Sequence, residues 1–152
     1  MKKYILILPV ILFLTQCSKK DVVAVIPPSN LNTRAVGASA NEFLSGAKYT
    51  SINVQLQYMP GYAPDQGALD NLTTFLNTLT NKPGGINFTK SQIAASGKSS
   101  FTTQEIADIE KANRTQFTSG STLSVYIIYL DAPYSTANVV GLAYRNTSLA
   151  VF

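Results

Sequence analysis

Apolar and polar residues alternate along the middle of the chain in a way that predicts a first strand near residue 50. Ile52, Val54, Leu56 and Tyr58 are separated by asparagine and glutamine residues. This period of two is typical of a strand that buries one face and exposes the other. Pro60-Gly61 is expected to end the strand, since both residues favour turns. We therefore predict that this strand is half buried.

The pattern then changes to one that predicts a helix. Pro64 suits the first helical turn, where its missing N–H is not needed, and Asp65 suits the positive end of the helix dipole. The run Asn81-Lys82-Pro83-Gly84-Gly85 is expected to end the helix. Apolar residues recur at helical spacing between these limits and lie on one face of the predicted helix: Ala68, Leu69, Leu72, Phe75, Leu76 and Leu79.

A second helix is predicted after residue 100 from its start signals. Thr102 and Glu105 have the spacing of a capping box, in which each side chain bonds the backbone N–H of the other residue. Phe101 and Ile106 occupy the two positions of a hydrophobic staple. The helix is expected to run to about residue 116.

Four further segments are predicted to be strands. Residues 86–94 form the weakest of them, whereas residues 123–130 are almost all apolar, as in a strand buried on both faces. Residues 139–144 and 148–152 predict two more strands around a short turn. The resulting order, β-α-β-α-β-β-β, favours an α/β fold. We expect a single small domain with a twisted mixed β-sheet of four to five strands and two backing helices.

The N-terminus carries the features of an export signal. Met1-Lys2-Lys3 is basic, and residues 4–14 form an apolar run of 11 residues, whereas a membrane-spanning helix needs about 20. The segment Leu14-Thr15-Gln16-Cys17 resembles the lipobox of bacterial lipoproteins, although Gln16 stands where that motif has a small residue. The resemblance implies that Cys17 is lipidated and becomes the mature N-terminus. The alternative is a signal anchor with an incidental cysteine.

These features divide the chain into three parts. Residues 1–16 are predicted to be a lipoprotein signal peptide, residues 17–33 a tether, and residues 34–152 the α/β domain. The predicted location is the cell envelope, at the outer membrane or the cell surface, with the membrane reached through the lipid on Cys17. Loss of the two signal lysines lowers the net charge from +4 to +2. So small a positive charge does not indicate nucleic acid as a partner.

The composition excludes several kinds of active site. The chain has no histidine and one cysteine, so it forms neither a Ser-His-Asp triad, nor a histidine metal site, nor an intrachain disulfide. Most acidic residues, Glu110 among them, are expected to be solvated. Asp131 is the exception, because it follows the predicted strand 123–130, and α/β proteins place functional residues at such positions. The alternative role for Asp131 is that of an ordinary turn residue.

Several stretches of the predicted domain stand out together: VGASANEFL at 36–44, KYT at 48–50, SGK at 96–98, FTTQEIADIE at 101–110 and GLAYRNTS at 141–148. This combination resembles a Bacteroidetes lipoprotein family of membrane metalloproteases, which are metzincin-like zinc metallopeptidases. The resemblance covers residues 34–152, and none of the matching stretches is a catalytic motif.

The resemblance implies that this chain is the N-terminal part of a metalloprotease domain. In the family, a twisted sheet with backing helices precedes an active-site helix with the motif H-E-x-x-H, whose histidines bind zinc while the glutamate acts as general base. The zinc activates a water for hydrolysis of a peptide bond. The motif does not occur here. We therefore expect no cofactor in this chain, zinc only in the full-length family, and no activity of this chain alone.

The resemblance also places one late strand at the edge of the sheet, beside the substrate cleft. A peptide or protein substrate in extended form would pair there with the main chain. The alternative is an ordinary edge strand without a ligand. No zinc ligand and no catalytic residue of this chain are implied. The residues implied for the substrate edge are Val140, Gly141, Leu142, Ala143, Tyr144 and Arg145.

Two other functions also fit the sequence. One is a complete, non-enzymatic lipoprotein domain with a binding or envelope-structural role, and the other is an inhibitor that shares the non-catalytic half of the protease. The last residues, Ala150-Val151-Phe152, lie within an apolar segment and are followed by no polar tail. This feature predicts a truncated chain, although a terminal strand can end in the same way.

Overall fold

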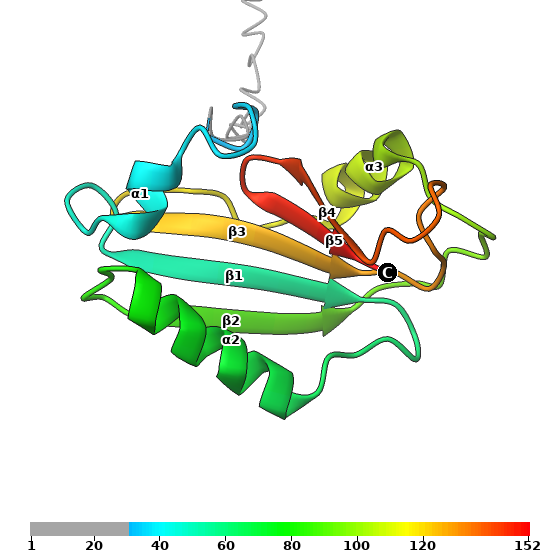
Figure 1. Cartoon of the computed structure of the whole chain (residues 1–152), viewed down its shortest axis with the longest axis horizontal. Helices are drawn as coiled ribbons and strands as arrows, with labels where there is room; N and C mark the ends of the chain where they lie inside the picture. The colour runs from blue at the N-terminus through cyan, green and yellow to red at the C-terminus, as the bar shows by residue number, and fades with distance from the viewer. Residues whose placement is uncertain (1–30) are drawn as a thin grey trace, which may run out of the picture.

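A computed structural model of the chain describes residues 31–152 as one layer of strands with helices on both faces (Figure 1). The predicted signal peptide, Cys17 and most of the predicted tether lie outside the described residues. Within residues 31–152, none of the helices combines the length and the apolarity needed to cross a membrane. The elements are α1 (Ala40–Leu44), β1 (Ser51–Tyr58), α2 (Gln66–Leu79), β2 (Ile86–Gln92), α3 (Thr103–Asn113), β3 (Thr122–Tyr129), β4 (Gly141–Arg145) and β5 (Ser148–Val151).

The five strands form one mixed sheet in the order β2-β1-β3-β5-β4. Strands β1, β2, β3 and β5 run parallel, and β4 runs antiparallel beside β5. The α/β class, the mixed sheet of five strands and the order of strands and longer helices predicted from the sequence are confirmed. The five-residue helix α1 was not predicted, because so short a helix leaves no periodic pattern of apolar residues.

Strand β1 is buried on both faces, which corrects the prediction of a half-buried strand. Gln55 and Gln57, expected to face water, are 4% and 6% exposed. The Gln55 amide donates to the Asn113 carbonyl (3.3 Å), and its oxygen accepts the N–H groups of Thr115 and Gln116 (3.0 and 2.8 Å). These bonds satisfy the backbone where α3 ends, so the polar side chains are buried without losing their partners.

Helix α2 contacts the sheet with a narrower face than predicted. It lies along β2 (Figure 1), and the Asp65 side chain caps it by accepting the Ala68 N–H (2.7 Å). Leu69 is buried, but Phe75 and Leu79 are 58% and 52% exposed. The helix itself is confirmed, but part of the apolar face that the sequence indicates is open to solvent. The helix lies beside β2, which is an edge strand of the sheet (Figure 1).

Helix α3 begins as predicted. Thr102 Oγ1 accepts the Glu105 N–H (3.3 Å) and Glu105 Oε2 accepts the Thr102 N–H (2.8 Å), which confirms the capping box. The helix ends at Asn113, three residues earlier than predicted, because Gln55 binds the N–H groups that would continue it. Its inner face includes Glu110, which is 2% exposed. The prediction of a solvated carboxylate at this position is therefore wrong.

Apolar clusters lie on both faces of the sheet. One cluster joins Tyr126 and Ile128 of β3 to Ile106 of α3. The other joins Ile52 of β1 to the opposite face of β3, with Phe43 of α1 packed against it. The two clusters together make β3 the central strand of the core, in agreement with its apolar sequence.

The first described residues are fixed to the turn between β4 and β5. Asn146 Nδ2 donates to the Leu31 carbonyl (2.8 Å), and Thr147 Oγ1 donates to Asn32 Oδ1 (2.6 Å). Leu31 and Asn32 are 4% and 1% exposed. The packed part of the chain therefore includes residues that the sequence assigned to the tether. We call these two contacts the N-terminal clasp.

Candidate functional site

Strand β4 occupies one edge of the sheet (Figure 1). It comprises Gly141–Arg145 and, within residues 31–152, pairs with β5 alone. Val140 precedes the strand and is 77% exposed. The six residues that the sequence singled out therefore lie together at a sheet edge, five of them within the strand.

The main-chain groups of β4 that face away from β5 belong to Gly141 and Ala143. The Phe152 N–H donates to the Val140 carbonyl (3.1 Å), so these two opposite residues form a hydrogen-bonded pair. Bonded and non-bonded pairs alternate along antiparallel strands, and Gly141 and Ala143 fall on the non-bonded positions. The Val151 carbonyl is consistent with this assignment, because it points away from β4 and accepts the N–H of Leu130, the residue after β3 (3.0 Å). Two N–H and two C=O groups therefore point out of the edge.

The small residues of β4 leave apolar side chains of β5 accessible from the edge. Gly141 lies opposite Val151, and Ala143 lies opposite Leu149, so these four residues share one face of the sheet. Leu149 is 40% exposed and Val151 is partly exposed. Glycine and alanine project little above the sheet, so a neighbour at the edge can extend over them. We call Leu149 and Val151 the apolar shelf.

A β-bulge directs the end of β4 toward the opposite face. The register shifts between Ala143 and Arg145. Tyr144 packs against the cluster beneath α3, and Arg145 Nε lies 3.8 Å from Glu110 Oε2. Two successive side chains thus approach the same side of the sheet, which the regular alternation of a strand does not allow.

Glu110 is the centre of a buried polar cluster behind β4 and β5. Its Oε1 accepts hydrogen bonds from Asn32 Nδ2 (3.0 Å), Arg114 Nη1 (2.7 Å) and Ser148 Oγ (2.7 Å). The Glu110 and Arg114 side chains are 2% and 1% exposed, so their charges compensate each other away from water. Arg114 also donates to the Ser124 carbonyl (3.1 Å). The cluster therefore connects α3, β3, β5 and the first described residues, and we call it the Glu110 cluster.

Two tyrosines beside the Glu110 cluster are held in their neutral form. Burial raises the pKa of the Tyr144 phenol far above its usual value, and the Glu110 charge raises it further. Burial also raises the pKa of the Tyr126 phenol, which donates to Gln57 Oε1 (2.7 Å). A phenol with so high a pKa is a packing group and not a general base at neutral pH.

Asp131, the acidic residue that the sequence singled out, binds a loop. Its Oδ2 accepts the Ser96 N–H (2.9 Å), and its Oδ1 accepts the Ser96 hydroxyl. The carboxylate thus holds the loop after β2 against the end of β3. Because both oxygens are occupied, the geometry favours the turn-residue role over a catalytic one.

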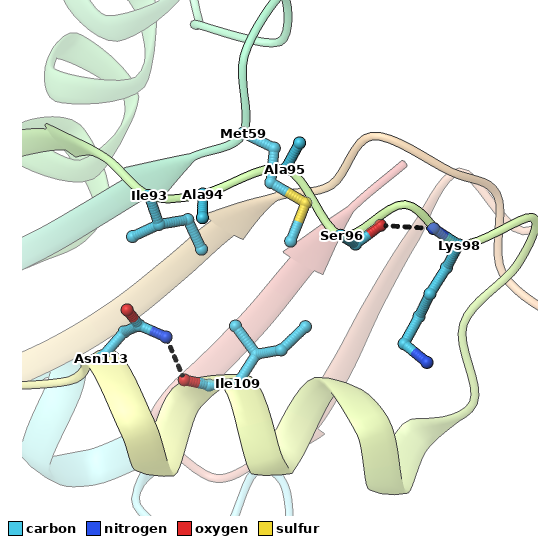
Figure 2. Close-up of a pocket in the computed structure, with 8 residues that line it drawn as sticks. All are labelled: Met59, Ile93, Ala94, Ala95, Ser96, Lys98, Ile109 and Asn113. Atoms are coloured by element: carbon cyan, nitrogen blue, oxygen red, sulfur yellow. Dashed lines mark hydrogen bonds between the residues drawn. The ribbon is translucent and has the colours of Figure 1, made fainter.

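A hollow lies between the loop after β2 and helix α3 (Figure 2). It has a volume of about 250 Å³. Polar groups at its rim are engaged elsewhere, since Lys98 Nζ pairs with Glu105 (2.9 Å) and Asn113 Nδ2 donates to a carbonyl of its own helix (2.9 Å). The hollow therefore lacks a polar side chain set to orient a ligand. Its lining is mainly apolar, with Met59, Ile93, Ala94, Ala95 and Ile109.

The described residues do not fit a zinc site. Within residues 31–152, no three His, Cys, Asp or Glu side chains come together in a way that could hold a metal ion. Comparison with protein-family models, with curated proteins and with solved structures finds no match for this chain. The candidate site is accordingly the β4 edge, with the apolar shelf beside it and the Glu110 cluster behind it.

The sequence prediction missed the Glu110 cluster, although a signal was present. Glu110 follows Ile106 by four residues and so shares its face of the helix, which is the inner one. Arg114 follows after four more residues and supplies the opposite charge on the same face. A pair of opposite charges at this spacing, in line with an apolar residue, indicates a buried ion pair.

Proposed function

We propose that this chain is the N-terminal, substrate-holding part of a lipid-anchored, exported zinc metalloprotease. In this role, β4 pairs with an extended peptide, and residues outside this chain supply the zinc ligands. The observation that carries the proposal is the open β4 edge, where the N–H and C=O groups of Gly141 and Ala143 point away from the sheet. Such groups bind an extended peptide by adding it to the sheet as a further strand.

Two further features support this role. The family resemblance implies a strand at the sheet edge beside the substrate cleft, and β4 is an edge strand. The Glu110 cluster fixes the neighbouring strand from behind through Ser148. A binding edge held in one position orients a peptide with a small loss of entropy, and orientation is a large part of what an enzyme supplies.

The residues of this chain bind and orient, and they break no bond. Gly141 and Ala143 offer main-chain hydrogen bonds, and the apolar shelf offers a contact for side chains. The chemistry that zinc supplies in the family, activation of a water, requires ligands that the described residues do not provide.

The second candidate function is a non-enzymatic lipoprotein domain that binds peptides or proteins in the envelope. This function needs only the open β4 edge and the anchor at Cys17. Both functions use the same edge, so a measurement of peptide binding does not distinguish them.

The gene distinguishes the two functions. We expect an H-E-x-x-H motif encoded within roughly 20 to 50 codons after Phe152, in one of the reading frames, a span based on usual connection and helix lengths. A stop codon followed by an unrelated gene would exclude the protease and leave the binding domain. Metal analysis of the purified full-length chain is a second measurement. Stoichiometric zinc in this histidine-free chain would contradict the assignment of the zinc ligands to residues outside it.

A further inference from the structure

We propose that the β4 edge selects extended peptides with large apolar side chains at alternate positions. The proposal rests on the role of β4 as the peptide-binding strand, and it adds the chemical class of the peptide. A strand added beside β4 places every second side chain on the face that carries Gly141 and Ala143. The apolar shelf, Leu149 and Val151, lies on the same face.

The spacing of strands explains why large side chains are required. Neighbouring strands lie about 4.8 Å apart, so a peptide beside β4 lies about 9.6 Å from β5. Leucine, methionine and phenylalanine side chains can extend across a glycine or an alanine toward Leu149, whereas serine and threonine are too short. A large residue at position 141 or 143 would block this path, so the small residues present there make the shelf accessible.

No charged side chain of β4 or β5 lies on the shelf side. Arg145 is the one charged residue of the two strands, and at the bulge it approaches Glu110 on the opposite face. On that face Leu142 and Tyr144 are already packed against the cluster beneath α3. An uncharged apolar contact is therefore available to the peptide on the shelf side.

Peptide binding to the full-length chain in lipid nanodiscs tests the selection, with empty nanodiscs as the blank. Fluorescence anisotropy compares two labelled peptides of about seven residues, a length typical of strands. One peptide alternates Leu with Thr, and the other alternates Ser with Thr. We expect the Leu peptide to bind about tenfold more tightly, because its leucines lose apolar surface to the shelf. Equal affinities would overturn the selection and leave peptide pairing intact, whereas no binding of either peptide would overturn both.

Leu149→Ser tests the shelf, with Phe75→Ser as its matched control. Both positions hold apolar side chains with large exposed fractions, 40% and 58%, but Phe75 lies on α2 beside the other edge of the sheet. We expect L149S to bind the Leu and Ser peptides with about equal affinity, and F75S to retain the preference for the Leu peptide. Retention of the preference in L149S, or its loss in F75S, would overturn the assignment to the shelf.

Ala143→Pro tests the main-chain pairing, with Lys90→Pro as its control. The N–H of each residue points out of its edge of the sheet, so neither proline removes a hydrogen bond between strands. We expect A143P to lose binding of both peptides and K90P to retain it, with thermal unfolding as the check that each variant is folded. Binding by A143P at the original affinity would overturn the proposal.

Changes in the peptide give the same test without altering the protein. N-methylation of one alternate set of amides should abolish binding, and N-methylation of the other set should not, because one set faces β4. Equal effects of the two sets would overturn strand pairing. A dimer of the chain that A143P dissociates would show that a second copy occupies the edge, and this result would also overturn the proposal.

Discussion

The two edges of the sheet are built differently. At the β2 edge, the outward-facing main chain includes that of Phe88 and Lys90, because the alternate residues bond to β1. The Lys90 side chain is exposed, and α2 lies alongside the strand (Figure 1). At the β4 edge, the outward groups belong to Gly141 and Ala143, which carry no charge. Lysine at an edge discourages strand addition, whereas a small and neutral edge permits it.

The support behind the two edges differs as well. The strand next to β4 is bonded to the Glu110 cluster, in which a buried carboxylate meets a guanidinium and a hydroxyl. On the α3 side of the sheet, β2 is contacted by Gln116, whose Nε2 donates to Thr89 Oγ1 (3.0 Å) in an exposed position. The difference indicates that the fold holds β4 in place while leaving it open, and shields β2 with a charge and a helix.

The largest expected effect is that of Glu110→Gln, which removes the charge behind β4. Arg114 would remain buried without its partner, and breaking a buried pair in this way costs about 3–5 kcal/mol of the free energy of unfolding. Gln116→Ala, on the β2 side, is the control and should change that free energy by no more than about 0.5 kcal/mol. Urea unfolding of both variants measures the difference. Similar losses in the two variants would remove the contrast between the edges.

The next effect concerns the helix beside β2. Leu69→Ala should lower the free energy of unfolding by about 2 kcal/mol, because Leu69 is 5% exposed and its removal leaves a cavity. Phe75→Ala, six residues later on the same helix, should change it by no more than about 0.5 kcal/mol, since Phe75 is largely exposed. Thermal and urea unfolding measure both values. A larger loss of stability in F75A than in L69A would show that α2 packs through the side that carries Phe75.

A smaller, pH-dependent effect is expected at the start of α3. The hydrogen bond from Lys98, followed by that from the Thr102 N–H, lowers the pKa of Glu105 to about 2. Its usual value is about 4.3, so folding favours the charged form. The stabilisation is complete above the usual pKa and is lost as the pH falls toward 2. The thermal midpoints of the wild type and Glu105→Gln should therefore differ at pH 6 and converge near pH 2. A difference that persists at pH 2 would contradict this account.

The smallest expected change in stability is that of Lys90→Val, which tests whether a charge closes the β2 edge. Valine suits a strand, so the free energy of unfolding should change by no more than about 0.5 kcal/mol. Removal of the charge should nevertheless promote pairing of β2 edges between molecules. Sedimentation of the full-length chain in nanodiscs would show this as an increase in self-association. An unchanged sedimentation profile would mean that α2 alone shields the edge.

Local signals were sufficient to predict the order of strands and helices. The capping box at Thr102 and the alternation that begins at Ile52 depend on neighbouring residues, and both mark elements that the structure contains. Burial of polar residues was not predictable in the same way. Gln55 and Glu110 are buried because they bond to residues 58 and 78 positions away, Asn113 and Asn32. Such distant partners are brought together by the fold and leave no local pattern, unlike the Glu110–Arg114 pair, whose spacing of four residues is visible in the sequence.

In the candidate site, too, some features have a local signal in the sequence and others depend on distant partners. The position of β4 near the end of the chain followed from its sequence, and the resemblance pointed to it as a binding edge. Which main-chain groups point outward depends on the register with β5, and a shift of one residue would exchange Gly141 for Leu142. The bulge that turns Arg145 toward Glu110 depends on the same pairing. Register is a property of two strands together, so neither strand's sequence specifies it alone.

The N-terminal clasp has a consequence for the order in which the protein folds. Leu31 bonds to Asn146 and Asn32 bonds to Thr147, and each pair is separated by 115 residues. A chain is synthesised from its N-terminus, so Leu31 and Asn32 emerge long before their partners. Contacts of such high sequence separation form late and slowly. The clasp is therefore expected to close after the sheet has assembled. Its closure brings Asn32 to Glu110 and so completes the set of side chains that donate hydrogen bonds to this carboxylate.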